Sequence, residues 1–220
     1  MFIVCRSVKG GSGTSVVTAA LASLASTSSN TVLVDLAGDQ PAIFGSVTPI
    51  AGVTDWMNAP HAESPFDTDI SIDDQLHIVP TGQRPLPHRD APSWNALVER
   101  LVESSARSTI IVDLGTHDAP TSLIEAADRV LLVVRPCYLA LRKAVALAVK
   151  ADSVVVVDED QRALRPRDVE SVLGLPVVAI VKTHPSVARR VDAGLFHRRL
   201  PDSLAAPLRD ILTETSSSNS

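Results

Sequence analysis

Aromatic side chains are scarce in this sequence, where they make up 3% of 220 residues. Proteins that stack nucleic-acid bases on aromatic rings need more of them, so such a platform is disfavoured. An excess of positive charge is also lacking, because the formal net charge is −5. A chain that binds nucleic acid over its whole surface would carry the opposite sign, which leaves only a local basic patch as an option.

Cysteine is nearly absent, since only Cys5 and Cys137 occur, and two cysteines supply no disulfide framework. Cys5 lies in an apolar run and is expected to be a buried free thiol. No apolar run approaches the ~18 residues that span a bilayer, and the first residues do not resemble a signal peptide. The sequence also lacks a CxxC pair, a Cys/His metal cluster and a Ser/His/Asp set at recognisable spacing. We therefore expect a cytoplasmic protein without thiol, zinc or triad chemistry.

Short β-branched apolar runs alternate with longer segments of helical spacing along the chain. Several runs are apolar at nearly every position, which is typical of strands buried on both faces of a parallel sheet. The alternation predicts an α/β fold with a doubly wound, mainly parallel seven-stranded sheet and helices on both faces. The predicted strands are residues 2–5, 31–35, 76–79, 109–113, 130–134, 154–157 and 177–181. The predicted helices are residues 15–27, 93–105, 139–150, 167–173, 186–193 and 202–212.

Two stretches interrupt this alternation. Residues 48–74 are rich in Pro, Asp and Ser and predict a long excursion with short helices, and residues 82–92 contain three prolines and predict a loop. We expect one domain over residues 1–212 and a disordered Ser-rich tail over residues 213–220. Ligands should bind at the carboxyl edge of the predicted sheet.

A glycine-rich segment follows the first predicted strand and opens the first predicted helix. It consists of Lys9, Gly10, Gly11, Ser12, Gly13, Thr14 and Ser15. The glycines allow a tight turn that points backbone N–H groups at an anion, and the helix N-terminus adds partial positive charge. The Ser15 hydroxyl is a candidate Mg²⁺ ligand. A glycine-rich turn without any ligand remains the alternative.

This segment resembles the deviant Walker A motif of the ParA/MinD family, K-G-G-x-G-K-[ST]. The resemblance implies a P-loop NTPase-like fold, ATP and Mg²⁺ as ligands, and a homodimer in which Lys9 reaches the partner's nucleotide. Thr14 stands where the family has its Walker lysine, and threonine supplies no positive charge to the phosphates.

Two further strand ends resemble elements of the same family. Asp35 matches the first aspartate of its D-x-D switch motif, whereas Ala37 replaces the second and Asp39 is a possible substitute. The sequence of residues 39–45 is similar to the D-x-P-A-x-x-G segment of the CpaE/TadZ branch of the family. Asp113 resembles the Walker B aspartate, which holds Mg²⁺ through water. A carboxylate that merely caps the next turn is the alternative for Asp35 and Asp113.

Later residues bear on the base and on partners. Asp158 falls where the family often places an asparagine that contacts adenine, and an ionised aspartate can only accept hydrogen bonds. Basic residues near the end of the chain could bind DNA phosphates, or could form a solvated helix face. They are Arg189, Arg190, Arg198 and Arg199. The helix predicted over residues 202–212 is short and carries few cations, which disfavours a membrane anchor.

The departures at Thr14 and Ala37 both weaken hydrolysis more than binding. The resemblance therefore implies a spatial organiser or scaffold for a pilus or secretion machine, or for a partition cargo, with little or no ATPase activity. It would act with a protein partner from a larger assembly. An active partitioning ATPase that binds DNA non-specifically and a nucleotide-free interaction module are the alternatives.

Overall fold

The computed structural model describes residues 1–46, 51–59, 64–159, 163–197 and 200–213. Eight strands form one sheet in the order β3-β4-β2-β5-β1-β6-β7-β8, and every neighbouring pair is parallel except β3 and β4. The strands are β1 (Phe2–Arg6), β2 (Thr31–Asp35), β3 (Ile70–Ser71), β4 (Leu76–Val79), β5 (Thr109–Gly115), β6 (Arg129–Val134), β7 (Ser153–Asp158) and β8 (Val177–Lys182).

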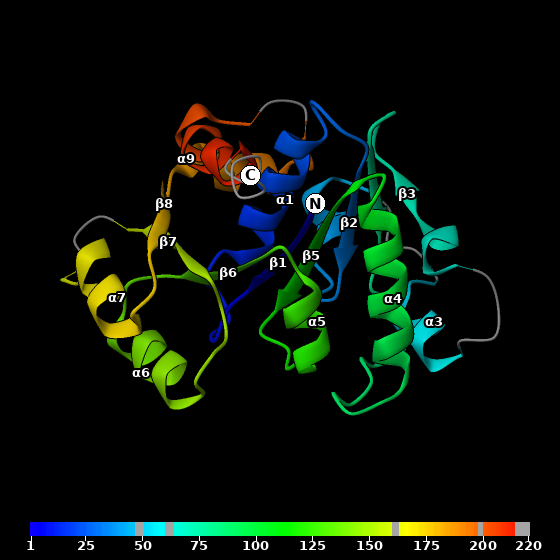
Figure 1. Ribbon diagram of the computed structural model, residues 1–220. Helices are drawn as coiled ribbons and strands as arrows, with labels where there is room; N and C mark the ends of the chain where they lie inside the picture. The colour runs from blue at the N-terminus through cyan, green and yellow to red at the C-terminus, as the bar shows by residue number, and fades with distance from the viewer. Residues whose placement is uncertain (47–50, 60–63, 160–162, 198–199, 214–220) are drawn as a thin grey trace, which may run out of the picture.

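Helices cover both faces of this sheet (Figure 1). They are α1 (Thr14–Ala25), α2 (Gln40–Ile43), α3 (Val53–Asn58), the 3₁₀ helix η1 (Pro65–Thr68), α4 (Ser93–Ser105), α5 (Thr121–Ala126), α6 (Tyr138–Ala146), α7 (Pro166–Leu173), α8 (Pro185–Asp192) and α9 (Asp202–Thr213). One core cluster lies beneath α1 and α9, and two others lie on the opposite face beneath α3 to α5 and beneath α6 and α7. The doubly wound prediction is confirmed.

The central strands show why their sequences are apolar throughout. Every residue of β5 is buried, because helices cover both faces of the sheet there. Alternate residues of β1 enter opposite cores, with Ile3 and Cys5 facing α1 and with Phe2 and Val4 facing α4. The free thiol of Cys5 is buried as expected, and burial raises its pKa to about 12.

The sheet has eight strands where seven were predicted. The extra strand, β3, contains only two residues and pairs antiparallel with β4 at the edge of the sheet. The excursion predicted for residues 48–74 does contain short helices, α3 and η1, and residues 82–92 form a loop. Helices α2 and α5 were not predicted, because four and six residues are too few to establish a 3.6-residue period.

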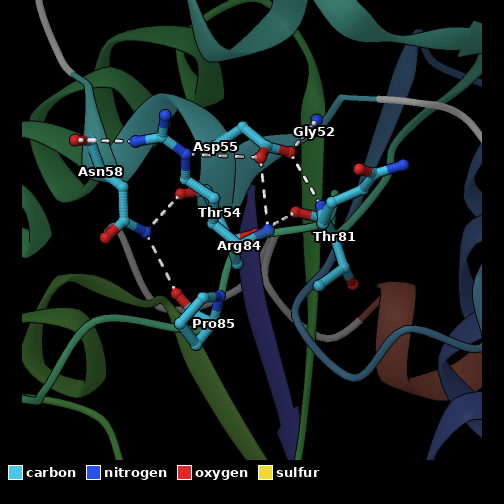
Figure 2. A network of polar contacts seen from close by, with 8 residues as sticks. Gly52, Thr54, Asp55, Asn58, Thr81, Arg84 and Pro85 are labelled. Atoms are coloured by element: carbon cyan, nitrogen blue, oxygen red, sulfur yellow. Dashed lines mark hydrogen bonds and ion pairs between the residues drawn. The ribbon is translucent and has the colours of Figure 1, made fainter.

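A polar network fixes the loop that follows β4 (Figure 2). The Asp55 carboxylate accepts hydrogen bonds from the N–H groups of Gly52, Gln83 and Arg84 at 3.0, 2.9 and 3.3 Å. The Thr54 hydroxyl donates to the carbonyl of Thr81 at 2.7 Å. Backbone donors of the loop thus find partners on α3, which holds residues 81–84 in place without regular structure.

The last helix, α9, packs against α1 and β8. Leu204, Leu208 and Ile211 are buried in the core that it shares with α1. Its apolar face is therefore occupied inside the domain. No helix within the described residues is long and apolar enough to cross a bilayer. Thr213, the first residue of the predicted tail, ends α9, and residues 214–220 lie outside the described part of the chain.

Candidate functional site

The glycine-rich segment forms an open loop between β1 and α1. Gly11 and Gly13 adopt positive φ angles of 75° and 86°, which glycine tolerates without strain. The Ser12 hydroxyl donates to the carbonyl of Lys9 at 2.7 Å and closes the turn. Gly13 caps α1 without a side-chain hydrogen bond, so the first turn of the helix keeps its N–H groups available to an anion. A Cβ atom on Gly10 or Gly11 would meet nothing within 4 Å.

A cleft runs from this loop toward α8. Its first part has a volume of about 620 Å³ and is lined by the loop, by Asp39 and by residues after β5. Its second part, of about 500 Å³, is lined by α8 and by the ends of β7 and β8. Both parts share Gly13, Val16, Val191 and Asp192, so they form one continuous space. Each part has the size of a small-molecule site.

Asp39 lies beside Ser15, the residue that the sequence suggests as a Mg²⁺ ligand. The Ser15 hydroxyl donates to Asp39 Oδ2 at 3.3 Å, and Asp39 lines the first part of the cleft. Ala37, which stands where the family has its second switch aspartate, lines the same space but offers no oxygen ligand from its side chain. The geometry thus brings a carboxylate to Ser15 from a position two residues later in the chain.

Asp35 is buried beneath the switch turn and does not line the cleft. Its carboxylate accepts hydrogen bonds from the N–H groups of Ala37, Gly38 and Gln40 at 3.1, 2.7 and 3.0 Å. Burial, followed by the nearby Asp113 carboxylate, raises the pKa of Asp35 to about 7, although these N–H groups act in the opposite direction. In this structure Asp35 shapes the turn that carries Asp39.

Asp113 lies beside Asp35 at the ends of the adjacent strands β5 and β2. The Gln40 side-chain amide donates to Asp113 Oδ2 at 2.6 Å and to the carbonyl of Ser15 at 3.0 Å. Burial raises the pKa of Asp113, while hydrogen bonds from Gln40 and Ser15 lower it. Gln40 was not predicted as a site residue, although it joins the residues of the glycine-rich loop, the turn after β2 and strand β5. Its position directly after Asp39 is the one feature of the sequence that could have indicated it.

No lysine stands in the first part of the cleft among the described residues. Thr14 is 6% exposed, and its hydroxyl oxygen is buried without a hydrogen-bond partner in the described structure. Lys9 is exposed and lines a neighbouring cavity with Arg135 and Tyr138, which adjoins the first part of the cleft at Gly10, Gly11 and Ser12. Lys9 itself does not line the first part of the cleft.

Asp158 and Arg135 lie near the far end of the cleft, where the base of a nucleotide was expected. Asp158 ends β7, and its carbonyl accepts from the N–H and hydroxyl of Thr183 at 2.9 and 3.2 Å. Asp158 is not among the described residues that line the cleft, so its contact with a base stays a prediction. Arg135 does line this end and pairs with Glu159 at 2.6 Å. Its place directly after β6, at the carboxyl edge, could have drawn attention to it.

The residues present fit a nucleotide phosphate with Mg²⁺. Within the described residues no group of three His, Cys, Asp or Glu side chains could hold a metal by itself. Mg²⁺ usually binds through one or two carboxylates together with substrate phosphates, and Ser15 and Asp39 supply such a partial set. The unpartnered oxygen of Thr14 and the open face of Gly10 and Gly11 suit a ligand above the loop.

A phosphate loop after the central strand, with strand-end aspartates beside it, defines a ParA/MinD-like P-loop fold. The chain superimposes on a ParA family ATPase from Chlorobium tepidum TLS with a TM-score of 0.73 at 19% identity, over 96% of this chain and 98% of that one. MinD of the Aquifex aeolicus MinC:MinD complex gives 0.74 at 19% identity, over 96% and 95%. MinD complexed with Mg-ADP from Pyrococcus horikoshii OT3 gives 0.73 at 17% identity, over 98% and 96%.

Residues 1–162 match the family of the cellulose biosynthesis protein BcsQ, and the chain belongs to that family. The matched region contains the glycine-rich loop, the switch turn and the Walker B strand. No curated protein matches the sequence significantly.

Proposed function

We propose that this protein binds a Mg²⁺–nucleotide complex in the cleft and acts as a nucleotide-dependent scaffold with little or no ATP hydrolysis. The observation that carries the proposal is the Ser15–Asp39 pair beneath an open glycine-rich loop. This arrangement retains the parts that hold phosphate and metal. It lacks the lysine that would neutralise charge as the phosphoryl group is transferred.

Binding should depend strongly on Mg²⁺. Asp39 and Asp192 line the cleft, and Asp113 lies directly behind it. A nucleotide that carries several negative charges would be repelled by these carboxylates in the absence of a cation. The metal supplies the positive charge that Thr14 cannot, with Ser15 and Asp39 as the residues that would hold it and Asp113 acting indirectly.

Hydrolysis should be impaired more than binding. One hydrogen bond to a charged group contributes about 1.5–3 kcal/mol, which corresponds to roughly tenfold to a hundredfold in affinity. The same contact strengthens as charge develops in the transition state, so its loss lowers the rate further. Asp39 offers a carboxylate near Ser15. Hydrolysis also requires a group that positions the attacking water, and Ala37 cannot supply that group.

A homodimer is supported by the surface beside the loop. Lys9 is exposed and lines one cavity with Tyr138 and Leu139 of α6, whose side chains are 70% and 63% exposed. A second copy that covered these apolar side chains would bring its own Lys9 toward the cleft of the first. Val145 and Leu147, also exposed, extend this apolar surface toward the end of α6.

The cargo is proposed to be a cell-envelope machine. The BcsQ family is described by cellulose biosynthesis, and the wording of residues 39–45 is similar to CpaE/TadZ proteins of pilus assembly. Both suggest that the scaffold positions an export apparatus through a protein partner. A partitioning role with DNA is the second candidate, because Arg189 and Arg190 on α8 make no ion pair with any described residue; Arg198 and Arg199 lie outside the described residues.

Calorimetric titration with ATP, ADP and a non-hydrolysable ATP analogue, each with and without Mg²⁺, tests the proposal. We expect micromolar binding with Mg²⁺, a loss of at least tenfold without it, and no steady ADP production. The variant Asp39→Asn should bind more weakly because the carboxylate next to Ser15 is lost. An absence of binding at millimolar nucleotide would establish a nucleotide-free interaction module instead, and turnover typical of partitioning ATPases would refute the scaffold with a silent site.

A further inference from the structure

A second cavity lies on the other face of the sheet from the phosphate loop. It has a volume of about 420 Å³ and is bounded by α5, by the end of α6 and by the loop before α4. It meets the nucleotide cleft only at Ser7, Thr116 and His117. Figure 1 shows α5 and α6 on the face opposite α1, on either side of the line of β1. The charged and titratable residues that line the cavity are Arg6, Arg89, His117, Asp118, Lys143 and Lys150.

The charge of this cavity is opposite to that of the molecule. Four cationic side chains and one carboxylate, Asp118, line it, in a chain whose formal net charge is −5. Like charges gathered in a concave site repel one another and raise the local potential, which favours an anion. Because the chain as a whole is acidic, this cluster of positive charge is a local property of the cavity and not of the whole surface.

Arg6 is the most informative of these residues. It ends β1, and its Nε atom is buried without a hydrogen-bond partner among the described residues. No other described residue forms an ion pair with it. Burial lowers the pKa of Arg6, with the neighbouring Arg89 adding to that effect and Asp118 opposing it. Arg6 is half-buried, and a buried guanidinium nitrogen without a partner has an energetic cost that a bound anion would remove.

The other cations are brought to the cavity by separate elements. Arg89 lies in the loop that the Asp55 network of Figure 2 anchors at residues 83 and 84, and it pairs with Asp118 at 3.0 Å. Lys143 lies on α6 and makes no ion pair with a described residue. Lys150 follows a turn in which Ala148 has a positive φ of 44°, and it pairs at 3.5 Å with Glu125, whose side chain is 68% exposed.

We propose that this cavity binds a small phosphorylated molecule that carries two neighbouring phosphate groups. Guanidinium groups such as those of Arg6 and Arg89 match phosphate oxygens in a two-pronged arrangement, and Lys143 and Lys150 add point charges. The apolar residues Ile124, Leu147 and Val149 line the same space and suit the organic part of such a ligand. The volume is that of a small-molecule site rather than a flat surface for a macromolecule.

Inorganic pyrophosphate is the probe, titrated in the absence of Mg²⁺ into isotope-labelled protein and followed by amide NMR shifts. We expect the largest shifts at Arg89, His117, Lys143 and Val149, and binding at least tenfold tighter than that of inorganic phosphate. The background variant Gly10→Asp separates this cavity from the phosphate loop. A Cβ atom at Gly10 would meet nothing within 4 Å, so we expect the fold to accept aspartate there and its carboxylate to repel anions from the loop.

Substitutions of the exposed cations Lys143 and Arg89 should leave the fold intact, because neither residue is buried. Lys143→Gln should weaken pyrophosphate binding by about tenfold, since one charge-assisted contact is lost. Arg89→Gln should do the same. Arg142→Gln is the matched control, because Arg142 is an exposed cation next to Lys143 on α6 that does not line the cavity. Shifts confined to residues 10–15, loss of binding in Gly10→Asp, or equal weakening by Arg142→Gln would each overturn the proposal.

Discussion

At the scale of single residues, Thr14 is the main departure of the glycine-rich loop from the Walker A pattern that it resembles. Its side chain is almost completely buried at the start of α1, and its hydroxyl oxygen has no partner among the described residues. A hydroxyl can donate one hydrogen bond to a phosphate but brings no charge. Compared with a lysine at this position, threonine therefore lowers the electrostatic attraction between the loop and a phosphate.

The variant Thr14→Lys should restore part of that contact. We expect nucleotide affinity to rise by about tenfold to a hundredfold, the range for one hydrogen bond to a charged group. Calorimetry with ATP and Mg²⁺ measures the change. Thr14→Met is the control, since it adds a similar length without charge. Equal affinities of the two variants would mean that the loop does not direct this side chain toward phosphate.

The paired carboxyl groups of Asp35 and Asp113 make stability depend on pH. The folded pKa of Asp35, about 7, lies above its ordinary value of 3.8, so the folded state binds the extra proton between these limits. Its stabilising contribution is complete below about pH 4 and is lost as pH rises to about 7, with a slope of at most ~1.4 kcal/mol per pH unit.

Urea unfolding at pH 5, 6, 7, 8 and 9 measures this effect, and Asp35→Asn isolates it. We expect the free energy of unfolding of the parent protein to fall more steeply from pH 5 to 7 than that of the variant. Above pH 8 the two slopes should agree, because the Asp35 carboxyl is then ionised in both the folded and the unfolded state. Parallel curves throughout this range would contradict the raised pKa.

At the scale of elements, the seven predicted strands all exist, because each has a mainly apolar core of the kind that a buried parallel strand requires. Among the helices with periodic patterns, α4 (Ser93–Ser105) was predicted with the bounds that the structure has. The predictions for α1 and α6 extended two and four residues beyond their ends at Ala25 and Ala146. The two-residue strand β3 and the six-residue helix α5 have no pattern long enough to detect. Tertiary contacts with neighbouring elements determine them.

The candidate site was predictable where its residues adjoin in sequence. The glycine-rich loop and the strand-end aspartates have recognisable spacing, and the structure places Asp39 beside Ser15. The contact of Gln40 with Asp113 depends on how the Asp35 turn folds, which no local pattern specifies. The cationic cavity draws Arg6, Arg89 and Lys143 from segments far apart in the chain, so only the three-dimensional fold shows that they meet.

The chain just after α2 contacts the segment after α8 through two glycines, Gly45 and Gly194. A Cβ atom on Gly45 would lie 2.6 Å from the carbonyl oxygen of Gly194, and both glycines have positive φ angles, of 68° and 62°. This contact fixes the end of α2, which begins directly after Asp39, against the segment between α8 and α9. The two walls of the cleft are thereby held at a defined separation.

Gly45→Ala should reduce the free energy of unfolding by about 2–4 kcal/mol, from the left-handed backbone and the overlap together. Gly174→Ala is a matched control. Gly174 has a φ of 65°, but an added Cβ would meet nothing within 4 Å, so only the backbone cost of about 1–2 kcal/mol applies. Urea unfolding compares the two. Equal losses would show that α2 shifts to accommodate the methyl group.

At the scale of the whole molecule, the exposed apolar side chains of α6 set the expected assembly. Leu139→Asp should abolish a nucleotide-dependent dimer, because it places a charge where Tyr138 and Leu139 would be buried. Light scattering after size-exclusion chromatography, with ATP and Mg²⁺ present, measures the mass. Val172→Asp on α7 is the control, since Val172 is 49% exposed and lies away from Lys9. A dimer that survives Leu139→Asp would place the interface elsewhere.

The central position of β1 in the sheet has a consequence for synthesis on the ribosome. Among the strands of this sheet β1 is made first, yet its partners are β5 and β6, and the Ser7 N–H donates to the carbonyl of Gly115 at 2.7 Å. The phosphate loop therefore acquires its stem only after more than a hundred residues have been translated. The face of α1 that packs against α9 stays uncovered until α9 has been synthesised. The nascent chain must keep the apolar residues of β1 and α1 from aggregating until β5, β6 and α9 have emerged.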